Sequence, residues 1–497
     1  MKKLVLLTGL VVMMLNASVS KTFADGYKIK ITVHGIKDTI AYFGYYYADK
    51  QFAKDTIHFD SKGEALIKGK EKLDEGVYLV IFPSMKNKYF EVLIGDDQNF
   101  SLETDTADFI KHMKVKGNNE LVAFYEYQKK MLDFYDKMEA LQKKYRATKD
   151  TAEQHKIKSE MADINKEVKD YWKQIIKNHP NTFLAVLVKA LIEPEVPKFK
   201  VPDNIANKDS ALQAKKYYYI KKHYFDNFNL SDPRLLYSPL YYRRVNNYFT
   251  RLLIQDPDTI IKEGHKMIEK ASGNKKTYQY MVAYMLGYYE RTKIMGMDKV
   301  FLDIAKNYYL AGKADWVDST FLAKLRDRVK KIEPNIIGEK AHDLRPMELA
   351  NGAFTSLYKV DADYTILVFW DPGCGHCKKA MPKIKKIHDK FKNKNVEVFA
   401  VCTITDTAEW KKFIREKDLN DFINVIDRYN LSHFRDYYDI YSTPVIYLLD
   451  KNKKIIAKRI DTDQLDELLE YKINGKKIPE HANNDDGKGK EKPKKKQ

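Results

Sequence analysis

The stretch at residues 364–379 constrains this chain more than any other, because it joins a predicted strand, a turn and a helix start to a pair of cysteines. Residues 365–370 are apolar and rich in side chains that favour β-strands. The Asp-Pro-Gly sequence at 371–373 supplies turn chemistry, and a lysine-rich segment with helical periodicity begins at the first cysteine. We therefore expect Cys374 to lie where a strand turns into a helix.

A cysteine at that position has a chemical reason to be reactive, because the nucleophile is the thiolate. The unpaired N–H groups in the first turn of a helix favour the anion over the thiol. Cys374 is thus the expected nucleophile, and Cys377 is close enough along the helix to close a disulfide with it and act as the resolving thiol. His376 can carry positive charge beside the thiolate, which would make the disulfide more oxidising. The pair would be the redox centre, and we expect no other cofactor.

Other interpretations of the cysteine pair fit less well. A zinc site usually needs four ligands, and the only other cysteine, Cys402, has no Cys or His near it at ligand spacing, so we expect no metal. Covalent haem attachment needs a histidine directly after the second cysteine, where this chain has Lys378. An inert structural disulfide remains open. Cys402 falls in the predicted strand 396–403, where a buried apolar role is favoured over a regulatory one.

A second motif lies further along, where Thr443 and Pro444 precede the apolar run 445–450. Proline at the head of a strand is a place where a cis X–Pro bond is tolerated. With the Trp-Asp-Pro-Gly-Cys-Gly-His-Cys sequence at 370–377, this motif makes the segment 334–478 resemble the thioredoxin superfamily. Within it, the similarity is to extracytoplasmic thiol-disulfide oxidoreductases of the TlpA/ResA type.

The resemblance implies that Thr443 and Pro444 lie against the reactive disulfide and, with Trp370, contact substrate. It also implies protein thiols and disulfides as substrates, and a membrane-anchored or soluble redox partner. Two acids of the family are missing, since Val368 and Ala380 stand at the positions where relatives carry proton acceptors for the resolving thiol. Protein disulfide isomerases share the Cys-Gly-His-Cys sequence, so the direction of electron flow stays open among reductase, oxidase and isomerase.

The two ends of the chain have distinct compositions. In residues 1–24, Lys2 and Lys3 precede an apolar run at 4–15 and small residues before a cleavage site, which predicts a secretory signal peptide too short to span a bilayer. No cysteine is present for a lipid anchor, so we expect a soluble periplasmic or secreted protein. Residues 479–497 are lysine-rich and predicted to be a disordered tail.

Between the ends, the pattern predicts a multidomain protein. Residues 25–107 alternate apolar and polar positions, which predicts an antiparallel β-sandwich-like domain of six to eight strands. The aromatic run at 42–47 fits strand residues with every second side chain in the core, and less well a carbohydrate or peptide platform. Residues 108–333 predict an all-α domain, and 334–478 the α/β thioredoxin-like domain. This order resembles secreted thioredoxin-like proteins whose front domains have no assigned activity.

Helices are expected at 118–145, 152–178 and 277–290, where charged and tyrosine-rich segments show helical patterns. Asp232-Pro233 and Asp256-Pro257 look like helix starts, because a capping acid precedes proline at the first helical position.

The net charge of +19 does not by itself indicate a nucleic-acid partner. Basic residues are interleaved with acids, and the chain shows no groove-reading motif, so we expect no nucleic acid and no membrane contact. Two functions follow. The first is a periplasmic thiol-disulfide oxidoreductase acting through Cys374 and Cys377. The alternative is a secreted binding or scaffold protein in which the front domains grip a partner and the thioredoxin-like domain is a secondary module.

Overall fold

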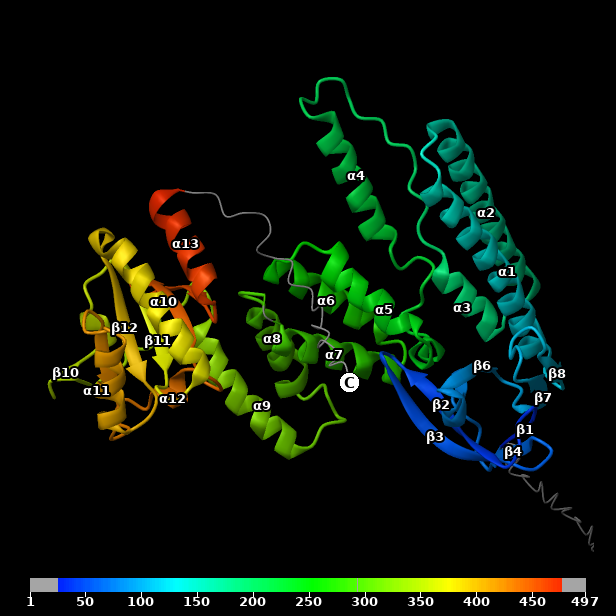
Figure 1. Cartoon of the computed structure of the whole chain (residues 1–497), viewed down its shortest axis with the longest axis horizontal. Helices are drawn as coiled ribbons and strands as arrows, with labels where there is room; N and C mark the ends of the chain where they lie inside the picture. The colour runs from blue at the N-terminus through cyan, green and yellow to red at the C-terminus, as the bar shows by residue number, and fades with distance from the viewer. Residues whose placement is uncertain (1–25, 293, 476–497) are drawn as a thin grey trace, which may run out of the picture. The chain divides into compact units, whose positions relative to one another are not determined.

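The computed structural model describes residues 26–292 and 294–475, and the chain forms two compact units, one ending at Leu252 and the other starting at Leu253 (Figure 1). The predicted signal peptide at 1–24 and the predicted tail at 479–497 lie outside the described residues. Among the described helices, none is long and apolar enough to cross a membrane. The predicted order of a β-rich part, a helical part and an α/β part is confirmed.

The first unit opens with two four-stranded sheets, in the orders β4-β1-β7-β8 and β3-β2-β5-β6. The strands are β1 (Tyr27–His34), β2 (Thr39–Tyr47), β3 (Lys50–Phe59), β4 (Glu64–Gly69), β5 (Gly76–Phe82), β6 (Lys88–Ile94), β7 (Asn99–Asp105) and β8 (Lys114–Lys116). Strands β1 and β7 are parallel, so the expectation of a purely antiparallel domain was wrong. In β2, Phe43 is buried and Tyr42 is exposed, as strand alternation requires.

The helices of the first unit follow these sheets. They are α1 (Asn119–Ala147), α2 (Thr151–Asn178), α3 (Phe183–Leu191), α4 (Lys208–His223), the short 3-10 helix η2 (Pro233–Tyr237), α5 (Leu240–Asn247) and the short π-helix η3 (Tyr248–Leu252). Helices α1 and α2 lie side by side (Figure 1). The predicted start at Asp232 is confirmed, because its side chain accepts a hydrogen bond from the N–H of Arg234 at the head of η2.

The second unit begins with the remaining helical segments, which are α6 (Pro257–Ala271), α7 (Lys275–Arg291), α8 (Asp298–Ile304), η4 (Ala305–Leu310) and α9 (Ser319–Ile332). Asp256 caps α6 by accepting a hydrogen bond from the N–H of Thr259, and Pro257 occupies the first turn, as predicted. The helical part of the sequence is therefore divided between the two units, since α1–α5 belong to the first.

A seven-stranded sheet follows, in the order β10-β9-β13-β12-β11-β14-β15. Its elements are β9 (Met347–Leu349), β10 (Phe354–Thr355), β11 (Tyr364–Trp370), α10 (Gly375–Phe391), β12 (Val396–Cys402), α11 (Thr407–Glu416), β13 (Ile423–Ile426), α12 (Phe434–Tyr437), β14 (Val445–Asp450), β15 (Ile455–Lys458) and α13 (Thr462–Asn474). Strands β11, β12 and β13 are parallel, whereas β14 runs antiparallel to β11.

Strand β11 is covered on both faces, which explains its unbroken apolar sequence. Ile366, Val368 and Trp370 belong to the core cluster that also contains residues of α10, α11 and α13. Leu367 and Phe369 face the opposite cluster. Because β11 is central and ends at residue 370, the turn that follows it opens at the carboxyl edge of the sheet, where the cysteines lie.

Candidate redox site

Cys374 occupies the N-cap of α10, directly after the turn that leaves β11. Its carbonyl oxygen accepts the first helical hydrogen bond, from the N–H of Lys378 at 3.0 Å, and its own N–H donates to the Asp371 carbonyl at 3.1 Å. The Cys374 side chain is half-buried, and the two residues that follow it, Gly375 and His376, are exposed. A substrate can therefore approach this sulfur from solvent.

Cys374 lies against the loop that carries the second motif. As a thiol, its Sγ donates to the carbonyl oxygen of Thr443 at 3.3 Å. The Thr443–Pro444 peptide bond is cis. The Thr443 side chain, followed by the backbone N–H groups of Cys377 and His376, stabilises the thiolate and lowers the pKa of Cys374 to about 7. About half of the Cys374 side chains would thus be ionised at neutral pH.

Cys377 lies one helical turn further on, and its environment is the opposite. Its side chain is fully buried among apolar residues, and its Sγ accepts a hydrogen bond from the N–H of Asp371 at 3.5 Å. Burial raises the pKa of the Cys377 thiol to about 11. Both sulfurs are free thiols in the structure. The geometry gives the pair one accessible, acidic thiol and one shielded thiol.

The positions of the other predicted site residues agree to different degrees with their predicted roles. His376 is exposed at the start of α10 and contributes its backbone N–H to Cys374. Trp370 is fully buried, with its ring 4.9 Å from that of Phe413 on α11. The prediction that Trp370 contacts substrate does not fit this position. Strand alternation places its side chain on the inner face, under α11, rather than at the mouth of the site.

Cys402, the third cysteine, is buried on β12 directly opposite Trp370 in the register of the sheet. Burial raises the pKa of its thiol to about 12. A thiol in such surroundings is protonated and unreactive at neutral pH, which agrees with the role of a small apolar core residue.

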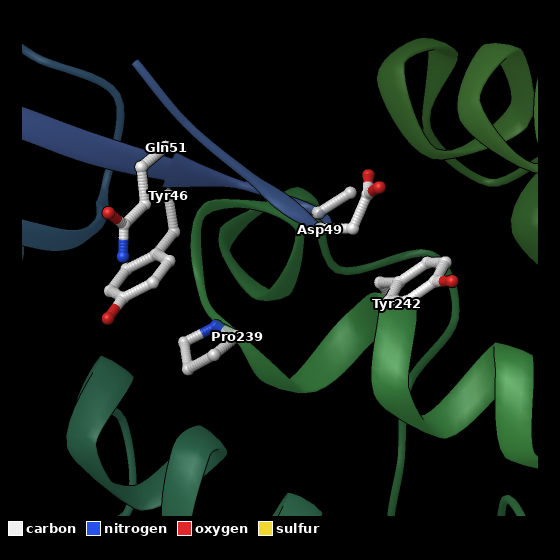
Figure 2. A pocket seen from close by; sticks show the side chains of 6 residues that line it. Tyr46, Asp49, Gln51, Pro239 and Tyr242 are labelled. Carbon is white, nitrogen blue, oxygen red and sulfur yellow. The ribbon is translucent and has the colours of Figure 1, made fainter. Parts of the chain in front are cut away.

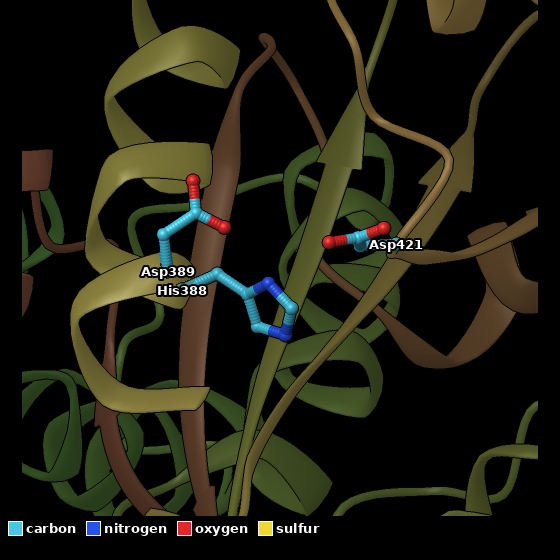
Figure 3. Close-up of side chains that lie close together, drawn as sticks. All are labelled: His388, Asp389 and Asp421. Carbon is cyan, nitrogen blue, oxygen red and sulfur yellow. The ribbon is translucent and has the colours of Figure 1, made fainter. Parts of the chain in front are cut away.

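One cluster of described residues elsewhere in this unit has side chains that could hold a metal ion. His388 and Asp389 on α10 and Asp421 before β13 bring their ligand atoms within 4.8 Å of one another (Figure 3). Both carboxylates already have ammonium partners, since Lys385 Nζ lies 2.5 Å from Asp389 Oδ1 and Lys392 Nζ lies 3.0 Å from Asp421 Oδ2. A cation would have to displace both lysines, and we therefore assign no metal to this cluster.

The sequence analysis did not single out Asp439, a buried carboxylate in the segment that leads into Thr443 and Pro444. Its carboxylate forms ion pairs with Arg328 of α9 and with Arg459 after β15. No local sequence pattern predicts these ion pairs, because Arg328 lies 111 residues before Asp439 and Arg459 lies 20 residues after it. The one local signal is the position of Asp439 between Tyr438 and Ile440, because an acid among apolar and aromatic residues often has a buried partner.

Comparison with known proteins gives two family matches. Residues 361–455 match a thioredoxin-like family, and residues 146–335 match a domain of unknown function, DUF5106. The chain is 27% identical over 135 residues to the thiol-disulfide oxidoreductase ResA of Bacillus cereus, which covers 27% of this chain and 76% of that relative. It is 32% identical over 105 residues to ResA of Bacillus thuringiensis subsp. konkukian, covering 21% of this chain and 59% of that relative.

Among solved structures, a domain of a possible thiol-disulfide isomerase from Cytophaga hutchinsonii is 44% identical. The match covers 29% of this chain and 99% of that domain, with a TM-score of 0.27. A thioredoxin-like protein from Bacteroides caccae is 21% identical, with 56% of this chain and 99% of that one covered and a TM-score of 0.44.

Proposed function

The C-terminal part of this chain belongs to the thioredoxin superfamily and is related to TlpA/ResA-type thiol-disulfide oxidoreductases, and on that premise we propose that Cys374 and Cys377 exchange disulfides with protein substrates. The observation that carries this proposal is the position of Cys374. Its Sγ lies at a helix N-cap, half-exposed and 3.3 Å from the Thr443 carbonyl oxygen, where the thiolate is stabilised.

In the reducing direction, the Cys374 thiolate attacks one sulfur of a substrate disulfide. A bond forms between Cys374 Sγ and that sulfur, and the other substrate sulfur leaves as a thiolate. Cys377 Sγ then attacks Cys374 Sγ, which closes the Cys374–Cys377 disulfide and releases the second substrate thiolate. Two electrons pass from the pair to the substrate. One departing substrate sulfur takes the proton of Cys377, and the other takes from solvent the proton that Cys374 released on ionising.

The high pKa of Cys377 shapes the second step, because this thiol has to lose its proton as it attacks. The positions where relatives carry acids are occupied by Val368, which is buried in the core, and by Ala380. The first departing substrate thiolate is then the proposed proton acceptor, since it is the base that the reaction itself generates next to the pair. The reverse sequence of steps oxidises a substrate dithiol.

Trapping tests this mechanism. Cys377→Ser should accumulate mixed disulfides between Cys374 and substrate proteins, because the resolving attack is missing, and Cys374→Ser should accumulate none. Non-reducing electrophoresis and mass spectrometry of the captured peptides identify the attached sulfur. Equal, low capture by both variants would refute the proposal.

The reduction potential of the pair decides the direction. A value near that of thioredoxin, about −270 mV, marks a reductant, and a value near that of DsbA, about −120 mV, marks an oxidant. His376 should move the couple toward the oxidising end if its ring is charged beside the thiolate. His376→Pro or His376→Ala then lowers the potential, measured by equilibration with glutathione.

We place the protein in the periplasm or outside the cell, because residues 1–24 have the composition of a secretory signal and an oxidising compartment suits an exchange enzyme. N-terminal sequencing of the mature protein tests this proposal. An intact residue 1 in purified protein from its native host would contradict it.

The first unit supports a second candidate function, the binding of a short peptide or an oligosaccharide. A cleft of about 420 Å³ lies between the β2–β3 hairpin and the start of α5, lined by Tyr46, Ala48, Asp49, Gln51, Pro239 and Tyr242 (Figure 2). Two tyrosines beside an acid and an amide offer both apolar surface and hydrogen bonds. Titration calorimetry with short peptides and oligosaccharides, comparing the wild type with Tyr46→Ala, tests this function. Heats of binding that are the same in both proteins would refute it.

A further inference from the structure

We propose that Arg328 of helix α9 is a positioning residue for the redox site. It holds, through Asp439 and Tyr441, the segment that presents Thr443 and Pro444 to Cys374. The helical segment before the sheet would then be a part of the redox machinery, a role that goes beyond the proposed exchange reaction, which assigns it no task.

Asp439 is the centre of this arrangement. Its side chain is 5% exposed, and it lies at the start of the segment that ends in Thr443. One carboxylate oxygen pairs with Nη1 of Arg328, and the other pairs with Nη2 of Arg459, which also donates to the Asp439 carbonyl at 3.2 Å. A buried carboxylate needs such partners, because an unpaired charge away from water is strongly disfavoured. Removing Arg328 leaves one of the two carboxylate oxygens of Asp439 without a cationic partner.

Two more contacts tie the same segment to α9. The Arg328 guanidinium lies over the ring of Tyr441, with its carbon 4.4 Å from the ring centroid. Asn335, in the turn that follows α9, is buried and donates from Nδ2 to the Tyr437 carbonyl at 2.5 Å. Residues 437, 439 and 441 are thus all in contact with α9 or with the turn that follows it.

These contacts matter for chemistry because the held segment continues directly into Thr443. The carbonyl and the side chain of Thr443 are the partners of Cys374 in its thiol and thiolate forms, respectively. A shift of the segment would lengthen both hydrogen bonds and weaken the preference for the thiolate. Arg328 touches neither sulfur nor substrate, so it acts through Asp439 and Tyr441.

The structure also supplies a matched control. Asp298 of α8 forms a buried ion pair with Lys458 at the end of β15, so it too joins the helical segment to the sheet. Asp298 lies outside the segment at 437–443. Its partner Lys458 is influenced by the charge of Asp439 but forms its ion pair with Asp298. Loss of the Asp298–Lys458 pair should weaken the same contact between the two parts without releasing Thr443.

The test measures the ionisation of Cys374 in the reduced full-length protein. The rate of its alkylation by iodoacetamide is recorded as a function of pH, and mass spectrometry identifies the labelled peptide. In Arg328→Met, the midpoint should rise from about 7, so that labelling at pH 7 slows at least about two-fold. In Asp298→Asn, the midpoint should stay at the wild-type value, even where the melting temperature falls as far as in Arg328→Met.

Arg328→Lys should recover part of the shift, because it keeps the charge and loses the planar contact with Tyr441. Should Arg328→Met fail to fold, Tyr441→Leu replaces it, since Tyr441 is 70% exposed and its loss is tolerated by the core. An unchanged midpoint in a folded Arg328 variant and in Tyr441→Leu would overturn the inference, as would an equal shift in Asp298→Asn. The measurement needs no turnover, so a protein that never exchanges disulfides would refute the proposed function and leave this result to be judged separately.

Discussion

Cys374 and Cys377 are chemically identical side chains that the fold makes different, with pKa values of about 7 and about 11. The difference follows from helix geometry. A residue at the N-cap faces free N–H groups and solvent, and the residue three positions later points back toward the core. The sequence predicts this asymmetry once the helix start is recognised, because Cys374 follows the turn and Cys377 falls within the first turn of the helix.

Thr443→Val should raise the pKa of Cys374, because valine keeps the shape of threonine and lacks the hydroxyl that stabilises the thiolate. Alkylation by iodoacetamide at pH 7 should slow by a factor of roughly two or more. Ser442→Ala, at the exposed neighbouring position, is the control and should leave the rate unchanged. Equal rates in wild type and Thr443→Val would show that the hydroxyl does not bear on the thiolate.

The lowered pKa of Cys374 also predicts how the stability of the reduced protein depends on pH. In the unfolded chain a cysteine has a pKa of about 8.5, so between about 7 and 8.5 the unfolded state binds more protons than the folded state. The contribution of Cys374 is therefore fully present above about pH 8.5 and is lost as the pH falls through about 7. Urea unfolding of wild type and Cys374→Ser between pH 6 and pH 9 measures it.

The difference in free energy of unfolding between wild type and Cys374→Ser should grow in favour of the wild type as the pH rises across that window. Parallel stability curves for the two proteins would contradict the low pKa. Cys377 should show the opposite pH dependence, because its pKa is raised. Its contribution to the free energy of unfolding should be fully present below about pH 8.5 and be lost as the pH rises through about 11.

Trp370 shows where prediction of single residues failed. Its place in the motif suggested a substrate contact, but it shares a strand face with Ile366 and Val368 and lies in the core with them. Counting the alternation along the strand from the buried residues would have corrected this expectation. Arg328 and Asp439 were missed for a different reason, because a pair formed across 111 residues leaves no local pattern.

At the scale of elements, α10 is the helix whose first turn holds the reactive sulfur, and its inner face decides how firmly that turn is anchored. Ile384 is fully buried in the core under this helix, whereas Lys386 on the same helix is exposed. Ile384→Ala should lower the free energy of unfolding by about 2 to 5 kcal/mol, and Lys386→Ala by less than about 0.5 kcal/mol.

Chemical denaturation monitored by circular dichroism measures both changes. A loss for Ile384→Ala no larger than that for Lys386→Ala would mean that the helix is not anchored by this face. Cys374 should keep its alkylation midpoint in both variants under conditions where they are folded, because neither residue contacts the sulfur.

Element starts were easier to predict than element partners. Aspartate before proline identified the beginnings of η2 and α6, because capping and the fixed φ of proline are local effects. The parallel pairing of β1 with β7 was not predictable in that way, since the two strands are far apart in the sequence and either direction satisfies the same alternation. The central strands 364–370 and 396–402 were recognisable because both faces of each are apolar.

At the scale of the whole molecule, the sequence suggested a boundary at residue 334, where the thioredoxin-like pattern begins, but the second compact unit begins at Leu253. Near residue 334 the sequence pattern changes from that of helices alone to that of alternating strands and helices, and a change of pattern is what can be recognised from the sequence. Ion pairs such as Lys458 with Asp298 extend the unit backward across that change, and they become visible only when the chain is folded.

Two fragments test the importance of this longer unit. The fragment 253–475 should fold cooperatively and keep the Cys374 alkylation midpoint of the full chain. The fragment 334–475 lacks Arg328 and Asp298, so it leaves Asp439 with one cation and Lys458 without its carboxylate. It should melt at a lower temperature, and its Cys374 midpoint should be higher.

Differential scanning calorimetry and the alkylation assay provide both readouts. Identical melting temperatures and midpoints for the two fragments would mean that the helices α6 to α9 are dispensable for the site.

The complete burial of the Cys377 side chain has a kinetic consequence. Once the two sulfurs are joined, an external thiol can reach only the Cys374 atom, so the protein that recycles the couple must begin its attack where the substrate also attacks. Substrate and recycling partner then take turns at a single atom, each leaving before the other arrives. Turnover of this kind is ping-pong, with double-reciprocal plots that stay parallel as the concentration of the second reactant changes.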